Sequence, residues 1–331
     1  MPEYIKKNWF ITLLFLSPLL AWPWPELGSY KGPLRANLIN KIAVTLIFFM
    51  NGITLNKNLI FSAASKTKAL IAIQSLCFLA APIFAYAFTK TYFKLYTFPQ
   101  GFITGTYILA CLPTTIASCA ILTEMTGGNK AISLFNALLS NTLGVIIAPL
   151  LLKTLISQND SLLNFNIKPM VTELIVLIVI PMCLGFVTHI KFPLSQKYQK
   201  YFTPISKTLL LFIVYSAFCN TIVEAKAIPS PWDEILLLFL GMGILHIWYL
   251  FLAWATGKYF FDNKGETLAI LFTAPQKTVA VGIPMCIALL SETGSMQTLG
   301  FTTLPLLLYN NVQWIAAGIL SHYLSNRKRP T

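Results

Sequence analysis

The sequence predicts an all-α polytopic membrane protein, and three observations predict it. Of the 331 residues, 56% are hydrophobic and only 11% are charged, whereas a soluble domain carries roughly 25% charged residues. Apolar runs of about 20 residues recur along the chain, and a helix of that length matches a hydrocarbon core of roughly 30 Å. These runs are continuous rather than alternating, which excludes a membrane β-barrel.

Ten apolar segments are long enough to be transmembrane helices. With the N-terminus inside, fifteen lysines and arginines fall in inside segments and seven in outside loops, which predicts that both termini are cytoplasmic. We expect an integral protein of a bacterial inner (plasma) membrane. The predicted spans are 9–25, 34–54, 68–89, 100–124, 129–152, 168–190, 204–224, 233–257, 266–290 and 298–324.

Several function classes are excluded by composition and motifs. The net charge of +13 is typical of a membrane protein whose basic loops set orientation, so we expect the lipid bilayer and not nucleic acid as a partner. No zinc-binding HExxH pattern or nucleotide-binding GxxxxGK[ST] pattern occurs. The polar residues inside the spans form no catalytic constellation. The chain is therefore not expected to be an enzyme or to need a cofactor.

The fourth and ninth spans differ from plain apolar helices, because each contains a proline followed directly by polar residues. Pro113 precedes Thr114 and Thr115, and Pro275 precedes Gln276 and Lys277. Proline lacks an amide donor, so the helix kinks or unwinds there. Unwound backbone at membrane depth is tolerated only where it is buried in protein or lines a cavity.

The two prolines also predict an internal symmetry. They lie 162 residues apart, about half the chain, and spans four and nine are equivalent in two five-helix halves. An odd number of spans per half inserts the halves in opposite orientations. We therefore expect one transmembrane domain over residues 1–331, built as two inverted five-helix repeats of about 1–155 and 165–325. Paired broken helices of this kind indicate the binding site of a secondary transporter.

Polar residues near the two breaks are the candidates for binding substrate or ions. They are Thr114, Thr115 and Ser118 on the fourth span, Gln276, Lys277 and Thr278 on the ninth, Ser133 and Asn136 on the fifth, and Gln74 on the third. Gln74, Asn310, Asn311 and Gln313 are equally consistent with interhelical hydrogen-bond clamps. We expect Gly101, Gly105, Ser140 and Gly144 to serve close helix packing.

Lys277 is the most unusual single residue, because a charge near the bilayer centre costs at least about 2.5–3.5 kcal/mol. No acidic residue lies near the centre of the same predicted span. Its ammonium has three possible roles: it binds an anionic substrate, occupies the place of a bound cation, or loses its proton through desolvation. A snorkelling lysine with only a packing role is the fourth alternative.

These segments resemble the bile acid:sodium symporter superfamily, in its sodium/bile-acid-cotransporter-like branch. The resemblance rests on Lys41–Leu55, on Pro113–Thr123 with Gly127–Asn129, and on Gln276–Pro284. It implies a panel of helices 1, 2, 6 and 7 beside a core of helices 3–5 and 8–10, with helices 4 and 9 crossing at the ion sites.

The resemblance also implies Na⁺ as a coupling ion. Ser118, Ser133 and Gln276 match sodium-coordinating residues, and Asn136 is the substitute ligand that the fifth helix offers. Cys119 stands where an asparagine is usual, and Phe272 where an acidic ligand is shared. Lys277 replaces a neutral residue, so the resemblance predicts at least one missing sodium site.

We therefore expect a secondary active transporter that moves a small organic, anionic solute by alternating access. The alternative is a membrane regulator of calcium homeostasis that transports nothing itself, because eukaryotic members of the branch are linked to calcium homeostasis.

Overall fold

Helices make up all the regular structure in the computed structural model, which describes residues 3–54, 63, 65–96, 98–156, 166–192, 196–227 and 232–326. The first half contains α1 (Glu3–Ala21), α2 (Pro25–Gly28), α3 (Ala36–Ile53), α5 (Thr67–Ser75), α6 (Ala81–Thr91), α7 (Gln100–Cys111), α8 (Ile116–Met125) and α9 (Lys130–Ile156). The second half contains α10 (Ile167–Leu174), α11 (Ile180–Lys191), α12 (Gln196–Ala227), α13 (Trp232–Phe260), α14 (Lys264–Thr273), α15 (Val279–Glu292) and α16 (Leu299–Asn326).

Two short π-helical turns join helices into longer rods. The turn η1 (Leu76–Ala80) connects α5 to α6, and η3 (Ile175–Val179) connects α10 to α11. In each case a proline, Pro82 or Pro181, is the second residue of the helix that follows. A proline there cannot donate to the ladder, so the preceding turn widens to keep the rod continuous.

Six helical rods of the described residues are long and apolar enough to cross a membrane, over 36–53, 67–94, 130–156, 167–191, 201–226 and 233–260. The prediction of an all-α polytopic membrane protein is thus confirmed. The other predicted spans correspond to α1, to α16 and to the pairs α7–α8 and α14–α15, whose breaks shorten each helix. In α16 the amides of Asn310, Asn311 and Gln313 reduce the apolar character. Ten spans in two inverted repeats remain a prediction.

The helix α12 extends beyond the predicted seventh span. That span was expected over residues 204–224, and the apolar part of α12 covers 201–226, but the helix itself begins at Gln196 and contains Pro204. Pro204 removes only one backbone donor from the helix, and Thr208 Oγ1 donates to the Pro204 carbonyl oxygen at 3.1 Å. The helix therefore continues past the apolar stretch that hydropathy detects.

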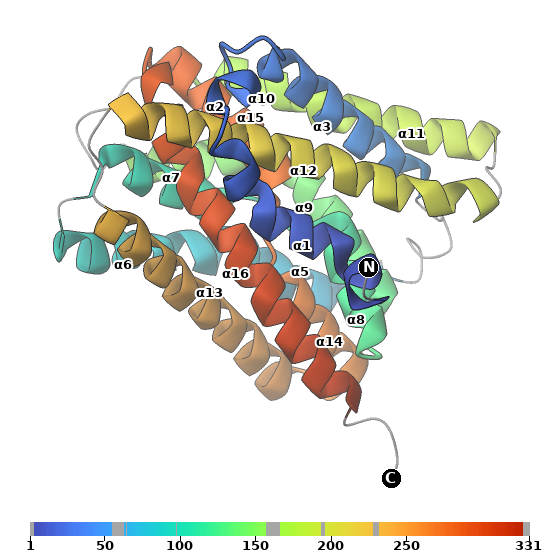
Figure 1. The fold of residues 1–331 in the computed structure, drawn as a ribbon. Coiled ribbons are helices and arrows are strands. Elements are labelled where there is room, and N and C mark those ends of the chain that lie inside the picture. The colour runs from blue at the N-terminus through green and yellow to red at the C-terminus, as the bar shows by residue number, and fades with distance from the viewer. Residues whose placement is uncertain are drawn as a thin grey trace.

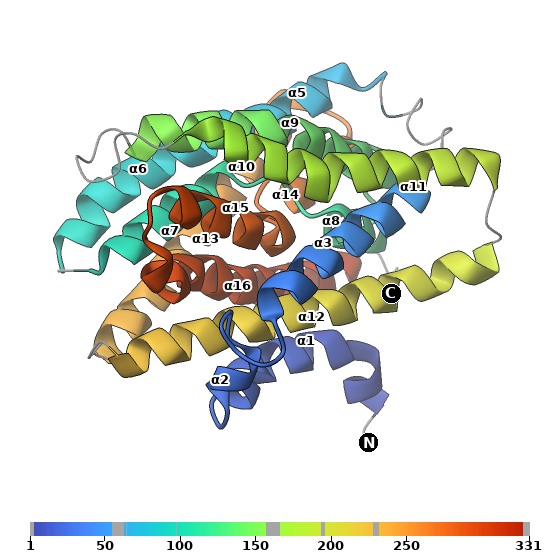
Figure 2. The ribbon, with the colours of Figure 1, turned by 90° about the horizontal axis from the view of Figure 1, so that it is seen from above.

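The helices α1, α3, α11 and α12 lie side by side in one layer, which Figure 2 shows from above. Glycines bring α3 and α11 into close contact. A Cβ on Gly52 would lie 2.1 Å from the carbonyl oxygen of Met182, and one on Gly185 would lie 2.1 Å from that of Phe49. Backbones that approach this closely gain dispersion contacts, which drive helix association in lipid.

The remaining rods form a second group, in which α7 packs along α16 and α13 along both α14 and α16 (Figure 1). Glycines again set the closest approach. A Cβ on Gly101 would lie 2.8 Å from Phe301 Cβ, and one on Gly105 would lie 2.1 Å from the carbonyl oxygen of Thr302. The predicted packing role of these two glycines is confirmed.

A carboxylate connects the two groups. Glu224 at the end of α12 accepts bonds from the backbone N–H groups of Gly300, at 2.7 Å, and Phe301, at 3.1 Å. These are free donors of the first turn of α16, and a negative charge is favoured at a helix N-terminus. A side chain from the layer of α1, α3, α11 and α12 therefore caps a helix of the other group.

Candidate functional site

The first break lies between α7 and α8, where residues 112–115 leave the helical conformation. Pro113 has no N–H group to continue the ladder of α7. The backbone that follows is satisfied from α9: Thr114 N–H donates to Ser140 Oγ at 3.2 Å, and Asn141 Nδ2 donates to the Thr114 carbonyl oxygen at 2.8 Å. Ser140 was expected to serve packing alone, which is wrong, because its hydroxyl also lies 3.0 Å from Thr114 Oγ1.

The second break lies between α14 and α15, and α16 satisfies its backbone. Gln313 pairs with Lys277 in both directions, because its Oε1 accepts from Lys277 N–H at 2.9 Å and its Nε2 donates to the Lys277 carbonyl oxygen at 3.1 Å. Tyr309 Oη donates to the Pro275 carbonyl oxygen at 2.7 Å. Gln313 is thus an interhelical clamp, one of the two roles that its sequence position allowed.

The two breaks touch each other. Thr278 N–H donates to the carbonyl oxygen of Pro113 at 3.1 Å, a backbone bond between segments that lie half the chain apart. Both prolines were predicted to interrupt their helices, and both do. The crossing is buried: Thr114 is fully enclosed and Gln276 is 2% exposed.

Lys277 places its charge at this crossing, with its side chain 1% exposed. Its Nζ donates to the carbonyl oxygens of Ala110 and Leu112, each at 2.9 Å, and of Cys77 at 3.2 Å. Three carbonyl acceptors match the three donors of an ammonium group. The lysine charge is therefore held by backbone dipoles and not by a carboxylate.

The three carbonyl oxygens are free for local reasons. Cys77 lies in η1, where its carbonyl would pair with the N–H of the fifth residue onward, and that residue is Pro82. Ala110 and Leu112 lie at the end of α7, where Pro113 stops the helix. The last carbonyls of a helix have no intrahelical partners, and its C-terminus attracts cations.

The other predicted ligands are distributed over separate pairs. Ser133 Oγ lies 2.8 Å from Thr123 Oγ1, and Ser118 Oγ hydrogen-bonds with Thr115 Oγ1. The proposed sodium ligands Ser118 and Ser133 therefore use their hydroxyl groups in different contacts. No group of three or more histidine, cysteine or acidic residues that could hold a metal occurs in the described part of the chain.

Gln74 and Asn136 form a third pair. Gln74 Nε2 donates to Asn136 Oδ1 at 2.8 Å and to the Asn136 carbonyl oxygen at 3.1 Å. Within the described residues, several buried polar atoms have no hydrogen-bond partner: Gln74 Oε1, Asn136 Nδ2, Thr273 Oγ1 and Gln276 Oε1. Buried polar groups normally have a hydrogen-bond partner, so these four atoms have hydrogen-bonding capacity that the described residues do not use.

Three residues of the crossing were missed by sequence reasoning. Asn141 and Tyr309 each hold a break through a backbone carbonyl, and Cys77 contributes a carbonyl to the lysine. The proline five residues after Cys77 is the one sequence signal that marks a free carbonyl. Gly144 behaves as predicted, because a Cβ there would lie 3.3 Å from the ring of Pro113.

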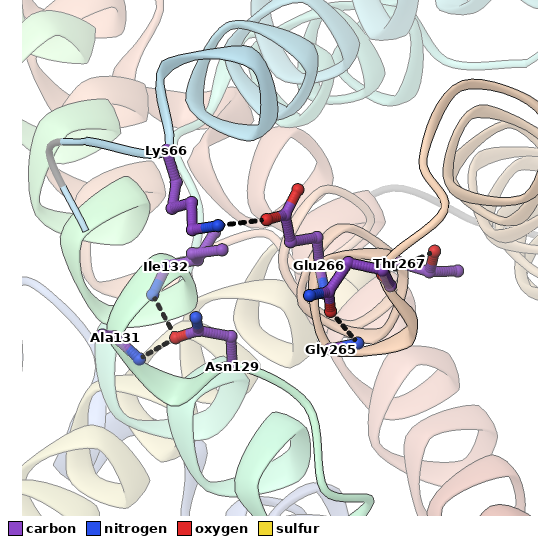
Figure 3. A network of polar contacts seen from close by, with 8 residues as sticks. Lys66, Asn129, Ala131, Ile132, Gly265, Glu266 and Thr267 are labelled. Atoms are coloured by element: carbon purple, nitrogen blue, oxygen red, sulfur yellow. Dashed lines mark hydrogen bonds and ion pairs between the residues drawn. The ribbon is translucent and has the colours of Figure 1, made fainter. Parts of the chain in front are cut away.

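A second polar network lies where the α8–α9 turn meets the α13–α14 turn (Figure 3). Asn129 N–H donates to the Gly265 carbonyl oxygen at 2.9 Å, and Lys66 Nζ pairs with Glu266 at 2.9 Å. Asn129 and Asn263 also cap α9 and α14 with their side-chain oxygens. This network joins the first half of the chain to the second at one end of the molecule.

The fold and the crossing define a class, that of polytopic helical membrane transporters with paired interrupted helices. The chain belongs to the SBF-like CPA transporter family, which matches residues 8–326. This finding confirms the resemblance to the bile acid:sodium symporters.

Three relatives carry the name sodium/bile acid cotransporter 7. The 7-B protein of Xenopus laevis is 28% identical over 98% of this chain and 95% of its own length. The Danio rerio protein is 28% identical over 96% of this chain and 93% of its own length. The Rattus norvegicus protein is 27% identical over 96% of this chain and 92% of its own length. The similarity therefore extends over nearly the whole of each chain.

Proposed function

We propose that this protein is a secondary transporter that moves a small organic anion by alternating access, with the ammonium of Lys277 in the place of one coupling cation. One observation carries the proposal: Lys277 Nζ is held by three backbone carbonyls where the two helix breaks meet. In transporters of this kind, unwound carbonyls and half-helix C-termini coordinate the coupling cation. Lys277 offers these groups a cation that is part of the chain.

The half-helix N-termini at the crossing support an anionic substrate. The helices α8 and α15 begin directly after the breaks, at Ile116 and Val279, and each N-terminus carries about half a positive charge. Such termini point at anionic substrate groups in transporters with discontinuous helices. The polar atoms of Thr273, Gln276 and Asn136 that have no partner in the described residues supply acceptors and donors for the rest of the solute.

Sodium coupling is weakened in this proposal. A Na⁺ ion 4 Å from the ammonium of Lys277 would be repelled by about 4 kcal/mol at an effective dielectric of 20. Phe272 and Cys119, which replace an acid and an amide by the resemblance, are both buried and offer no carboxylate or amide oxygen. Ser118, Ser133, Asn136 and Gln276 remain the candidates for one Na⁺ site.

Alternating access requires two bodies that move relative to each other. In the proposed topology the two inverted repeats, 1–155 and 165–325, each divide between a panel and a core. The panel contains α1, α3, α10–α11 and α12, and the core contains the other rods, including both breaks. Both termini are cytoplasmic, in a bacterial plasma membrane. The network of Lys66, Asn129 and Glu266 is then a closed contact at the cytoplasmic end, which must open during the cycle.

Transport assays on the purified protein in lipid vesicles test the proposal. We expect uptake of radiolabelled organic anions that does not require Na⁺. Lys277→Gln is expected to abolish uptake, whereas Lys258→Gln, an exposed lysine on α13, is expected to preserve it. Folded protein that transports no organic anion under any gradient would contradict the proposal and favour the alternative of a membrane regulator.

A further inference from the structure

A basic cavity lies where the chain turns from α2 into α3. Its volume is about 790 Å³, and it is lined by Lys31, Arg35 and Lys41 together with Asn37 and Leu38. None of its lining residues is acidic. The positive ends of the first peptide groups of α3 add to the cationic lining.

Two of the three cations have no counter-charge. Lys41 pairs with Glu173 of α10 at 2.8 Å, whereas Lys31 and Arg35 have no ion pair within the described residues. The nearby carboxylate of Glu26 pairs with Lys226 at 3.4 Å. Two free positive charges on one cavity wall favour an anionic group, and an arginine fork suits a phosphate in particular.

The turn that carries Lys31 and Arg35 is tightly packed. A Cβ on Gly32 would lie 2.0 Å from the Glu26 carbonyl oxygen, so this residue has to be glycine. Arg35 has φ of +46°, in the left-handed region that L-residues rarely adopt. Both features make this a tight connection, and Lys31 and Arg35 from it both line the cavity.

An apolar stripe leads away from the cavity along α3. Leu38, Ile42 and Leu46 follow one another on α3 at four-residue spacing, which puts them on one face of the helix, and they are 55%, 49% and 43% exposed. Trp22 and Trp24, 56% and 68% exposed, precede the cavity, and tryptophans of this kind mark the headgroup level of a bilayer. A phosphate held in the cavity is therefore continuous with a surface for an acyl chain.

We propose that this cavity binds the phosphate of an anionic phospholipid, with one acyl chain along the stripe of Leu38, Ile42 and Leu46. The proposal does not rest on the transport function. A soluble anion would use Lys31 and Arg35 but would gain nothing from an exposed leucine on the cavity wall, whereas a lipid uses both.

Binding is tested with the full-length protein in neutral detergent, by thermal unfolding and by native mass spectrometry. The probes are phosphatidylglycerol, phosphatidylcholine and inorganic phosphate. We expect phosphatidylglycerol to raise the unfolding temperature more than phosphatidylcholine. The double variant Lys31→Gln/Arg35→Gln is expected to bind phosphatidylglycerol at least tenfold more weakly. The matched control Lys94→Gln/Lys153→Gln removes the same charge from two other exposed positions, one in the short helical turn after α6 and one in the last turn of α9, and is expected to bind as the wild type does.

Each contrary outcome overturns the proposal. Equal effects of the two lipids would show that no anionic headgroup is recognised. Loss of binding in the control variant would assign the effect to net charge. Stabilisation by inorganic phosphate as large as that by phosphatidylglycerol would assign the cavity to a soluble anion. Leu38→Gln keeps both cations, and it is expected to weaken phosphatidylglycerol binding without changing the effect of phosphate.

Discussion

The two helix breaks occupy corresponding positions in the two halves of the chain, yet their backbone groups are satisfied in different ways. The first break presents carbonyl oxygens to the second. Those of Ala110 and Leu112 accept hydrogen bonds from the ammonium of Lys277, and that of Pro113 accepts one from the N–H of Thr278. The second break presents donors, and Gln313 satisfies both backbone groups of Lys277. In the hydrogen bonds between the two breaks, the first break thus supplies the acceptors and the second supplies the donors.

This difference teaches that equivalent positions need not build equivalent ion sites. A symmetric pair of breaks would leave carbonyls on both sides for mobile cations. Here Lys277 neutralises the acceptor side permanently, and α16 fixes the backbone from which that lysine extends. The predictions below test the asymmetry, from the largest expected effect to the smallest.

Replacement of Lys277 is expected to have the largest effect. Lys277→Ala removes the cation from three carbonyl oxygens, and an increase of about 1.4 kcal/mol in the transport barrier already lowers the rate about tenfold. We expect at least that loss of anion uptake in lipid vesicles. The freed carbonyls then form a vacant cation site, so Na⁺ is expected to raise the unfolding temperature of the variant more than that of the wild type. A Na⁺ response equal in both proteins would show that the lysine and the ion do not compete.

Removal of the clamp on the second break is expected to cost stability. Gln313→Leu leaves the N–H and the carbonyl of Lys277 without partners, and an unsatisfied buried group costs about 1–3 kcal/mol. We expect a lower unfolding temperature together with slower anion uptake, since the lysine loses its fixed backbone. Thr142→Val on α9, whose hydroxyl bonds only within its own helix, serves as the control. If Gln313→Leu has no larger effect than this control, the clamp has no structural role.

Weakening of the first break is expected to have a smaller effect. Asn141→Ala removes one bond to the Thr114 carbonyl oxygen, and single interhelical hydrogen bonds in membranes contribute about 0.6 kcal/mol on average. The first break retains Ser140 and Lys277, so we expect a modest drop in unfolding temperature with transport largely preserved. A loss of transport as complete as that of Lys277→Ala would place Asn141 in the substrate site itself.

The smallest effect is expected at the network of Figure 3. Glu266→Gln removes an ion pair with Lys66, whose side chain is 44% exposed while that of Glu266 is 15% exposed; pairs open to solvent on one side contribute about 0.2–1 kcal/mol. We expect little change in unfolding temperature but faster cysteine labelling of residues near the crossing from that side. Unchanged labelling would show that the pair does not hold the cytoplasmic end closed.

The breaks were predictable from sequence because the effect of proline is local. Pro113 and Pro275 each remove a donor within a span, and the polar residues that follow indicate buried unwound backbone. The depth of Lys277 was predictable for the same reason, since it follows Pro275 by two residues. The helix count by hydropathy was less secure, because the amides of Asn310 and Gln313 make α16 look less apolar than its length implies.

The partners of Lys277 were not predictable, because they are backbone carbonyls and every residue carries one. Only Pro82, five residues after Cys77, indicates that a particular carbonyl lacks its partner. The pairing of side chains was equally hidden. Asn136 and Asn141 lie on the same helix, and nothing in their spacing shows that one faces Gln74 and the other faces Thr114.

The attachment of Lys277 to the chain has a consequence for membrane voltage. A sodium ion travels with its substrate and adds one positive charge to each transport cycle, but a lysine stays behind. In the proposed scheme, a monovalent anion that crosses without such a companion moves its negative charge through the field. That movement is worth about 2.3 kcal/mol per 100 mV. An inside-negative potential would therefore drive the anion out of the cell rather than into it, so the cation cage at Lys277 would set the preferred direction of transport.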